Sequence, residues 1–567
     1  MNQAQQMWQA FSEDKIVYRD HDIIVINKPE NMPILAVSDG FPADVATRLK
    51  WALAEQSSAA LDDIFLGVHQ RLGQASSGLM VFSLSKEAQT SLSEQFEKRT
   101  VQERYRAVVA LEANKKPFTG RVEQWLTRGK GGVTVVKAHR FASARKALCK
   151  INCVKQSAHH ALLDIEIETE YSDPLRAVLA SLGMPIVGDA LCGAEAGCRL
   201  FLQAMELAFQ HPISGKALRF ELKEPADFES FFAKNTDTQF PKTDATELVL
   251  RAANRRWGIV KSQQSEKATE VFRLFNRDGD GDSRFALDVY KDWLVAHIYD
   301  VHDDSEINAL LDCFDALGYR GVYKKVHVQK AHELADAVSA GLTPKQALRG
   351  HDAPEQFSVL EYGLPYTVRL GDGLGTGLYL DQRRSRKRVF ELSRDKRVLN
   401  LFSHACAFGV AAGHGGATEV WHVDASKRLL EWGRDNVRLA GLGLEQQRFV
   451  TDDVFVFLKR LVRRSELFDV VILDPPTYSS VGKRRYSSKK DYIKLAEQCF
   501  SVLAPGGTLL ACSNFSGMTL KEMSAKLRKA AGDAHRKISG MNPLPDPCDF
   551  PCAPLKASPY KVIEVRL

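Results

Sequence analysis

The chain lacks paired cysteines, long apolar segments and a strong charge of either sign. Its ten cysteines among 567 residues include no CxxC pair and no companion histidine cluster. This pattern excludes a zinc site of the usual spacing and favours reduced thiols, mostly buried. The longest apolar runs, such as residues 468–473, are far shorter than the roughly 20 residues of a membrane-spanning helix. The polar N-terminal start is unlike a signal peptide. We therefore expect a cytoplasmic protein without a metal centre or a membrane span.

What the chain does have is the composition of a folded protein with several domains. Hydrophobic residues make up 44% and charged residues 26% of the sequence, as is usual for soluble globular chains. At roughly 100–200 residues per domain, a chain of 567 residues predicts more than one. The net charge of +7 leans mildly toward polyanionic partners such as nucleic acid.

Strand and helix patterns divide the chain into three domains, and the expected fold class is α/β. Residues 1–228 predict an α+β domain dominated by short strands, followed by a polar linker at 229–245. Residues 246–356 predict a small central α/β domain of an RNA-binding type. From 357 to 567, apolar strands alternate with helices, which predicts a doubly wound, Rossmann-like parallel sheet.

One strand of the last domain ends in an acid that two prolines follow. Residues 468–473 read as a buried strand, and Asp474, Pro475, Pro476 and Tyr478 come directly after it. Ligands of open α/β sheets bind beyond the carboxyl ends of such strands. The prolines fix φ and remove backbone donors, so they would hold the carboxylate and the aromatic ring in one geometry against a flat acceptor. An ordinary turn is the alternative reading.

Two further strands of this domain also end in acids. The strand at 398–402 leads into a turn at 403–409 and a helix, as the first unit of a nucleotide-binding fold does. The next strand ends about 20 residues later at Asp424, from where a carboxylate can bind ribose hydroxyls. A third strand ends at Asp452 and Asp453, where an acid can accept from an adenine amino group. The pattern predicts a nucleotide-like cofactor.

Several motifs in order resemble the 23S ribosomal RNA methyltransferases of the RlmI and RlmK types, which are class I S-adenosylmethionine-dependent enzymes. The motifs are Glu361-Tyr-Gly-Leu-Pro, Gly375-Thr-Gly-Leu-Tyr-Leu-Asp-Gln-Arg, Leu399-Asn-Leu-Phe-Ser, Gly415-Gly-Ala-Thr-Glu-Val and Leu473-Asp-Pro-Pro. The likeness covers about 246–567 and implies S-adenosyl-L-methionine as cofactor and ribosomal RNA as partner. The cofactor residues it implies are Asn400, Phe402, Ser403, His404, Ala405, Asp424, Asp452, Asp453, Asp474, Gln382 and Arg383. The catalytic residues it implies are Asp474, Pro475, Pro476, Tyr478, Asn514 and Cys512.

Two details bear on the cofactor and on the methylated base. Cys406 stands where these relatives usually have glycine, so its side chain is expected to narrow the cofactor site. Methylating carbon 5 of a pyrimidine needs a thiolate, but the position that matches the cysteine of the cytosine-modifying relatives is Phe515 here. Cys512 lies three residues earlier, and the alternative reading of it is a buried core thiol. The turn with Asn514 equally resembles that of guanine-modifying relatives. The target therefore stays open between cytosine C5 and guanine, with Tyr478 or Phe515 expected to stack on the base.

In the first domain, the segments Asn27-Lys-Pro, Val68-His-Gln-Arg-Leu-Gly-Gln-Ala-Ser-Ser-Gly and Gly183-Met-Pro-Ile-Val-Gly-Asp resemble motifs of the RluA-type pseudouridine synthases, but the nucleophile of that family is missing. The family's aspartate directly follows Arg-Leu, whereas Gly73 follows Arg71-Leu72 here. Tyr105 is retained, and of the Gly-Arg-Thr-His-Gln-Ile-Arg segment only Arg176 remains. The resemblance implies an inactive synthase whose Arg71, Tyr105 and Arg176 still bind RNA. The alternative for Arg71 and Tyr105 is that they now only pack. The alternatives are a bifunctional synthase and methyltransferase, or a non-catalytic RNA-binding or ribosome assembly factor.

Two charged segments complete the expectations. Lys483, Arg484 and Arg485 follow the Asp-Pro-Pro loop and are expected to contact the RNA backbone. The acidic run at 278–282 invites comparison with a calcium-binding loop, but the twelfth position of that loop would be Val289 instead of an acid. We therefore expect a solvated turn there.

Overall fold

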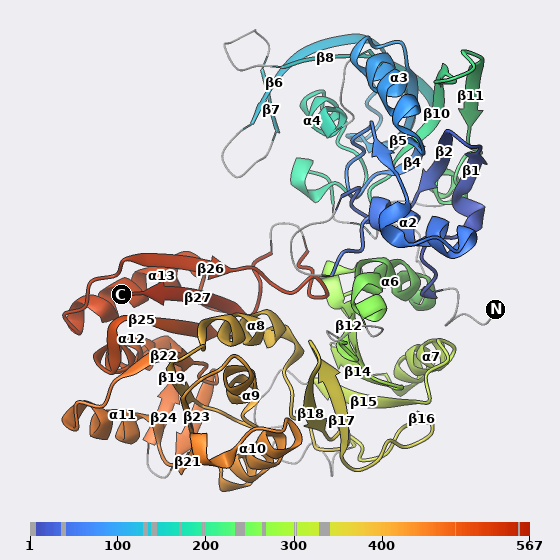
Figure 1. Cartoon of the computed structure of the whole chain (residues 1–567). Coiled ribbons are helices and arrows are strands. Elements are labelled where there is room, and N and C mark those ends of the chain that lie inside the picture. Colours follow the sequence, from blue (N-terminus) through green and yellow to red (C-terminus); the bar gives the residue numbers. More distant parts are fainter. Residues whose placement is uncertain are drawn as a thin grey trace.

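The computed structural model describes residues 7–35, 41–128, 134–137, 145–168, 173–195, 197, 199–232, 244–262, 268–299, 301, 303–327, 341–481, 484–553 and 556–567. Figure 1 shows the N-terminal part as one lobe and the rest of the chain as a second, broader lobe, with α6 (Ala245–Ser262) where they meet. We call the parts before α6, from α6 to β18, and after β18 the first, central and C-terminal modules.

The first module is built on a large mixed sheet of eleven strands with the order β1-β2-β4-β10-β5-β9-β8-β6-β7, to which β3 and β11 add by pairing with β4 and β10. Its strands β2 and β4 are wholly or nearly buried because their sequences are almost continuous apolar runs. The strands are β1 (Ile16–Arg19), β2 (Ile23–Lys28), β3 (Gly67–Val68), β4 (Ser77–Ser83), β5 (Gln102–Ala110), β6 (Gly120–Arg128), β7 (Thr134–Lys137), β8 (Arg145–Gln156), β9 (His160–Ile167), β10 (Leu202–Gln210) and β11 (Ala217–Glu221). The helices are α2 (Val45–Ser57), α3 (Lys86–Glu97), α4 (Asp173–Ser181) and α5 (Ala226–Glu229).

The central module has a five-stranded sheet of order β12-β13-β14-β15-β16 and a separate hairpin of β17 and β18. Helix α6 precedes the sheet. The other elements are β12 (Val271–Asn276), β13 (Phe285–Tyr290), β14 (Trp293–Tyr299), α7 (Asp304–Asp315), β15 (Gly321–His327), β16 (Arg349–Gly350), β17 (Phe357–Glu361) and β18 (Leu364–Val368).

The C-terminal module carries the predicted doubly wound sheet. Its order is β21-β20-β19-β22-β25-β27-β26. The first five strands in this order are parallel to one another, and β27 pairs antiparallel with both β25 and β26 at one edge. Strands β23 and β24 form a separate hairpin. The strands are β19 (Arg397–Leu401), β20 (Glu419–Asp424), β21 (Gln447–Thr451), β22 (Phe468–Leu473), β23 (Tyr478–Val481), β24 (Arg484–Ser487), β25 (Leu503–Ser513), β26 (Gly540–Leu544) and β27 (Lys561–Arg566). The helices are η8 (Leu380–Gln382), α8 (Arg383–Leu392), α9 (Ala407–His414), α10 (Lys427–Leu439), α11 (Val454–Arg463), α12 (Ser488–Ser501) and α13 (Leu520–Asp533). The fold class expected from the sequence is confirmed.

The first and central modules are packed together. Trp257 of α6 belongs to the apolar core of the first module, whereas Phe41 belongs to the core of the central module. Gly258 of α6 is required there, because a Cβ would come within 2.5 Å of the carbonyl oxygen of Pro42. Arg48 adds a hydrogen bond of 2.9 Å to the side chain of Asn254. The proposed boundaries near 228, 245 and 356 stay predictions.

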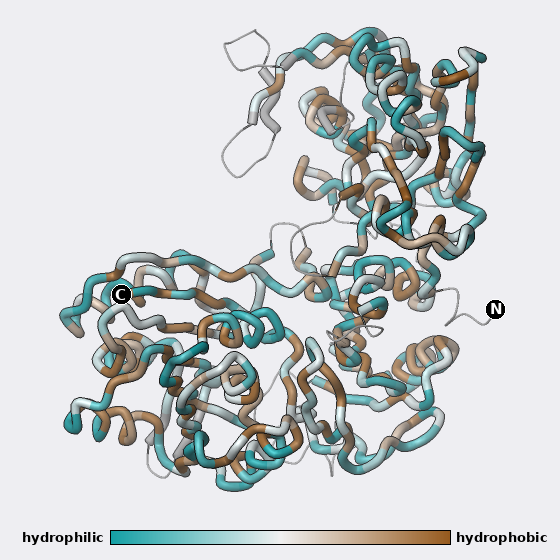
Figure 2. Tube along the Cα trace, in the orientation of Figure 1, coloured by the Kyte–Doolittle hydropathy of each residue, from teal (hydrophilic) through white to brown (hydrophobic). Residues whose placement is uncertain are grey.

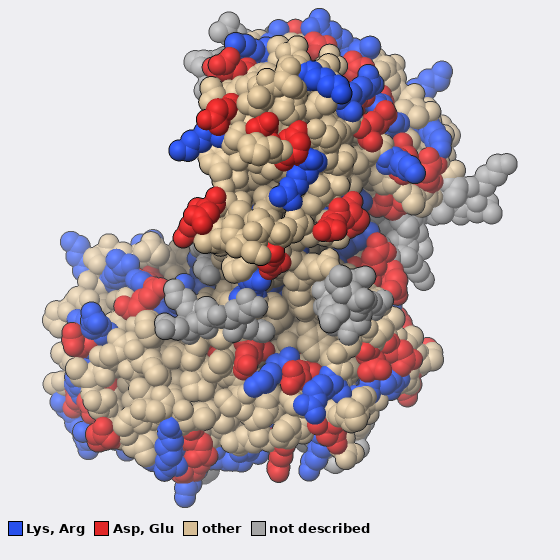
Figure 3. All heavy atoms as spheres, turned by 45° about the vertical axis from the view of Figure 1, so that its right-hand side comes forward, with Lys and Arg blue, Asp and Glu red and all other residues tan. Residues whose placement is uncertain are grey.

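The surface and the interior follow the usual division by polarity. Apolar stretches follow the sheets and the inward sides of the helices, and hydrophilic stretches follow the outer turns (Figure 2). On the face drawn in Figure 3, basic and acidic side chains are interspersed. Within the described part of the chain, no helix combines the length and apolar character that crossing a membrane requires.

Candidate active site

A cavity of about 300 Å³ lies where the strands of the C-terminal sheet end, and most of the predicted site residues line it. Parallel strands place their carboxyl ends at one edge of a sheet, so residues distant in sequence meet there. The predicted residues that line the cavity are Gln382, Phe402, Ser403, His404, Ala405, Asp424, Asp452, Asp453, Asp474, Pro475, Pro476 and Asn514.

The turn after β19 holds strained backbone at one end of this cavity. Phe402, His404 and Cys406 adopt φ values of 56°, 48° and 61°, in the left-handed region. Such conformations cost of order 1–3 kcal/mol each for residues other than glycine and cluster at functional sites. The backbone N–H of His404 donates to Asp424 Oδ2 at 3.0 Å, which ties the turn to the end of β20. The hydroxyl of Ser403 is buried without a hydrogen-bond partner among the described residues.

Cys406 does not narrow the cavity, contrary to the expectation from the sequence. It is fully buried and is not among the lining residues. Its Sγ instead packs against Gly433 of α10, where an added Cβ would lie only 2.2 Å from the sulfur. Burial raises the pKa of the Cys406 thiol far above its usual range. Gly433 on α10 thus makes room for the side chain of Cys406, which stands where the relatives usually have glycine.

The acids at the ends of β20 and β21 form one wall of the cavity. Asp424 Oδ1 accepts a hydrogen bond of 2.8 Å from the backbone of Ser426. Asp453 caps α11 by accepting from Val456 N at 3.1 Å, and Asp452 pairs with Arg460. These contacts fix the three carboxylates, so the wall is both acidic and rigid.

The other end of the cavity is formed around Asp474. Burial, with the charge of Asp381 adding to it, raises the pKa of Asp474 to about 7, while a hydrogen bond from Gln382 opposes the rise. Burial raises the pKa of Asp381 to about 6. Tyr560 and Arg386 also line this end. Asp381, Tyr560 and Arg386 were absent from the predicted set, because only tertiary packing brings them beside Asp474.

Four predicted residues lie elsewhere. Asn400 and Arg383 are both 1% exposed and do not line the cavity, and Arg383 forms a buried ion pair with Asp549. Tyr478 is 68% exposed and also stands outside the lining. Cys512 is completely buried within β25, where burial raises the pKa of its thiol well above the usual value. These four residues therefore do not line the cavity, and the roles expected for them stay predictions.

Aromatic side chains other than Tyr478 flank the cavity. Tyr486 of β24 is 4% exposed, lines the cavity and has its ring 6.2 Å from Phe402 and 5.8 Å from Phe455. Phe515 is partly buried against the neighbouring core and is absent from the lining. Lys483 and the side chains of Arg484 and Arg485 lie outside the described residues.

In the first module, the predicted RNA-binding residues differ in exposure and in their partners. Arg71 is exposed, whereas Tyr105 is 3% exposed and packs in the core, so its ring is not available for stacking. Arg176 makes a two-pronged ion pair with Asp189, with hydrogen bonds of 2.5 and 2.6 Å. Gly73 and Arg176 line a second cavity of about 460 Å³ whose other wall includes α6. The acids at 278–282 lie in a short 3-10 helix and the turn after it. The expectation that this turn is solvated is wrong for Asp280, whose side chain is 2% exposed and pairs with Arg256 at 2.6 Å.

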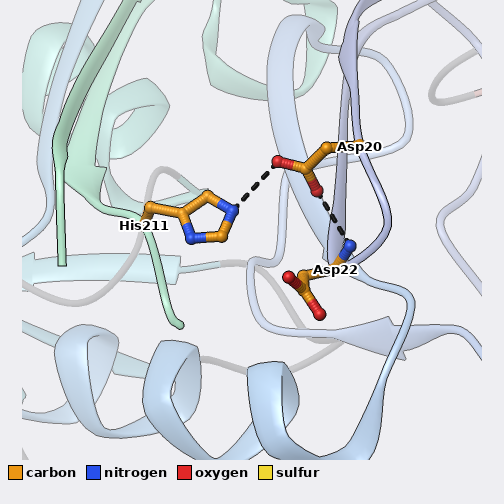
Figure 4. A group of neighbouring side chains, drawn as sticks. All are labelled: Asp20, Asp22 and His211. Carbon is orange, nitrogen blue, oxygen red and sulfur yellow. Dashed lines mark hydrogen bonds and ion pairs between the residues drawn. The ribbon is translucent and has the colours of Figure 1, made fainter. Parts of the chain in front are cut away.

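One group of side chains in the first module has the composition of a metal site (Figure 4). Asp20 Oδ2 lies 2.9 Å from His211 Nε2, and Asp22 stands beside them. However, Asp20 Oδ1 already accepts from two backbone N–H groups, and Oδ2 also accepts from Tyr18. Backbone N–H groups donate to His211 Nδ1, so its Nε2 carries the proton. The geometry is that of a hydrogen-bonded turn.

Comparisons with known proteins agree with this geometry. Residues 329–561 match the family of S-adenosylmethionine-dependent methyltransferases, and residues 22–181 match the family of RNA pseudouridylate synthases. The ribosomal RNA large subunit methyltransferase I of Photobacterium profundum is 31% identical over 282 residues, which are 49% of this chain and 70% of that protein. The chain belongs to the S-adenosylmethionine-dependent methyltransferases.

Other relatives of this methyltransferase support the assignment. The ribosomal RNA large subunit methyltransferase I of Aeromonas hydrophila is 30% identical over 303 residues, 53% of this chain and 74% of that protein. The crystal structure of SMU.776 complexed with SAH has a TM-score of 0.50 at 26% identity and covers 64% of this chain and 89% of that one. S-adenosylmethionine is therefore the cofactor of the C-terminal module.

The cavity suits this cofactor. Its acidic wall can bind a ribose and offset the positive charge of a sulfonium, and the unpartnered hydroxyl of Ser403 offers a further hydrogen bond. Asp424, at the end of the second strand, is the residue that we assign to the ribose. When bound, the cofactor would supply an electrophilic methyl group. The residues of the chain have to hold the acceptor beside it.

The preference for S-adenosylmethionine over SAH is expected to increase with pH. Raised pKa values of about 6 for Asp381 and about 7 for Asp474 mean that both carboxyls are largely protonated at pH 5.5 and ionised at pH 8. Only ionised carboxylates attract the sulfonium, which SAH lacks. Calorimetry across this range should show the affinity ratio rising by about tenfold, equivalent to roughly 1.4 kcal/mol. A ratio that stays constant with pH would contradict the assignment of this end of the cavity. Asp474→Asn should reduce the rise to the part that Asp381 contributes.

Proposed function

We propose that this methyltransferase transfers a methyl group to the exocyclic amine of a guanine in large-subunit ribosomal RNA. The RNA class follows the names of its relatives. The choice of guanine over cytosine C5 depends on one observation: the structure places no cysteine of the described residues on the lining of the cavity. Cytosine C5 chemistry needs a thiolate that attacks the ring.

Cys512 is the thiol nearest to this role, and its environment opposes it. It is fully buried, and burial together with the charge of Asp474 raises the pKa of its thiol. Tyr492 donates to its backbone carbonyl at 3.0 Å, which fixes the strand. We call the end of the cavity around Asp474 and Asp381 the acceptor end. The carboxyls there can accept hydrogen bonds from an amino group. N7 of guanine carries no hydrogen, so these carboxyls could not bind it in this way. We therefore propose the exocyclic amine as the methylated atom, and not N7.

Replacing Cys512 with serine is therefore expected to leave methyl transfer within about threefold of the wild type. The change keeps the side-chain size and removes the thiol, so only a thiolate mechanism would lose its nucleophile. Methyl transfer to ribosomal RNA from cells lacking the protein would measure it. A loss of 100-fold or more, with cofactor binding retained, would contradict the guanine proposal.

Mass spectrometry of nucleosides from the same RNA would test the product. We expect the wild type to yield N2-methylguanosine, and a 5-methylcytidine product would refute the proposal. The same digests would report pseudouridine. We propose that the first module forms none, because Gly73 offers no carboxylate and the nearby Asp189 is held by Arg176. Its part in the enzyme would then be to bind RNA.

A further inference from the structure

Tyr560 brings a hydroxyl without a hydrogen bond of standard geometry to the acceptor end of the cavity. The residue immediately precedes β27, is 6% exposed and lines the cavity together with Asp474. Its Oη makes no hydrogen bond of standard geometry to a described residue, although Asp474 and Cys512 lie beside it. A buried polar group left in this state is costly, so such groups call for a specific explanation. A ligand that fills this end of the cavity would supply the missing hydrogen bond.

The carboxyls around Tyr560 offer the opposite hydrogen-bonding character. Asp381 and Asp474 line the same end, and each is close enough to Tyr560 to raise the pKa of its hydroxyl. Gln382 donates its side-chain amide to Asp474 Oδ2 and so fixes that carboxylate. A carboxylate can accept several hydrogen bonds, so Asp474 can also accept from a ligand. The acceptor end thus combines one hydroxyl donor with a carboxylate acceptor held in place by a neighbour.

This combination complements one edge of guanine. Along that edge, guanine presents the acceptor O6, then the donors N1–H and the exocyclic amine. Cytosine presents one donor and then two acceptors, which a single hydroxyl would leave partly unpaired. Enzymes that act on extruded bases read them by hydrogen bonds to this edge. The order of donor and acceptors at Tyr560 and Asp474 therefore favours guanine.

We propose that Tyr560 is a specificity-determining residue that donates its hydroxyl hydrogen to O6 of the target guanine, while Asp474 accepts from N1–H and the amine. The proposal rests on the guanine methylation proposed above. It assigns to Tyr560 a role in choosing the base that is separate from cofactor binding. Without the hydroxyl, O6 would be buried without a partner, and guanine would lose its advantage over a base that lacks this oxygen.

The test compares two RNA fragments that carry the mapped target site, one with guanine and one with 2-aminopurine, which keeps the amine but lacks O6 and N1–H. Only the comparison of wild type with variant on each RNA is used, because the loss of N1–H affects both proteins alike. Tyr560→Phe in the full chain is expected to lower kcat/KM on the guanine RNA by about 10- to 100-fold. On the 2-aminopurine RNA, the wild type and the variant should have equal kcat/KM. Calorimetry should show that the variant binds S-adenosylmethionine as the wild type does.

Tyr492→Phe is the matched control, because it also removes a buried tyrosine hydroxyl near β25. Tyr492 does not line the cavity. The control variant should affect both RNAs equally. If Tyr560→Phe is as active as the wild type on guanine, or loses equally on both RNAs, Tyr560 does not read O6. If instead the wild type methylates no guanine at all, the proposed function itself fails, and the inference fails with it.

Discussion

Replacing Asp474 with asparagine is expected to lower the rate of methyl transfer by about 10²- to 10⁴-fold, the range typical for loss of a general base. A guanine amine that gains a methyl group must release a proton, and Asp474 is the carboxylate that the acceptor loop presents. Burial raises its pKa to about 7, so it can hold a proton near neutral pH. Asparagine keeps the shape and the contact with Gln382 but cannot take the proton. Single-turnover kinetics with saturating RNA would measure the loss.

The pH dependence gives this prediction a second readout. Asp474 must be ionised to accept, so kcat/KM of the wild type should rise as the pH increases through about 7 and then level off. Asp469→Asn, at the other end of β22, removes a carboxylate that accepts from Arg397 N and should keep the rise. If Asp474→Asn retained a tenth of the activity with the same pH profile, another group would have to accept the proton.

The acids of the site could be predicted because their positions depend on local pattern. Asp424, Asp452 and Asp474 each follow an apolar run, and parallel pairing of such runs brings their carboxyl ends to one edge whatever the loops do. The hairpin after Asp474 was less predictable. Tyr478 and Tyr486 lie on paired strands, one residue out of register, and only the twist and packing of the hairpin decide which ring faces the cavity.

Residues that depend on distant partners could not be assigned from the sequence. Cys406 was expected to obstruct the cofactor, but Gly433 on another helix gives its sulfur room. Tyr105 was expected to stack on RNA, but its position in β5 directs it into the core. Arg383 stands in a motif shared with cofactor-binding relatives, yet its partner is 166 residues away. No local pattern reports such pairings.

Removing this partner by Asp549→Ala is expected to destabilise the protein by about 3–5 kcal/mol, as measured for other buried ion pairs that lose one member. Asp549 is fully buried and Arg383 is 1% exposed, so the guanidinium would be left charged without water or a counterion. Asp549 also accepts from the backbone of Arg273 at 2.9 Å and, through its own carbonyl, from Arg256 at 2.8 Å. The loss should therefore loosen the contact between the central and C-terminal modules.

Urea unfolding followed by tryptophan fluorescence would measure this change, with Asp533→Ala as the control. Asp533 pairs with Lys529 at 3.1 Å on the surface of α13, and exposed pairs of this kind contribute about 0.5 kcal/mol or less. Adding Arg383→Met to Asp549→Ala should recover part of the stability, because the uncompensated charge is then gone.

Arg383 begins α8, which also carries Arg386, and directly follows Gln382. Asp549→Ala should thus weaken cofactor and RNA binding as well, whereas a fully stable variant would show that the pair is not what holds α8 beside the cavity.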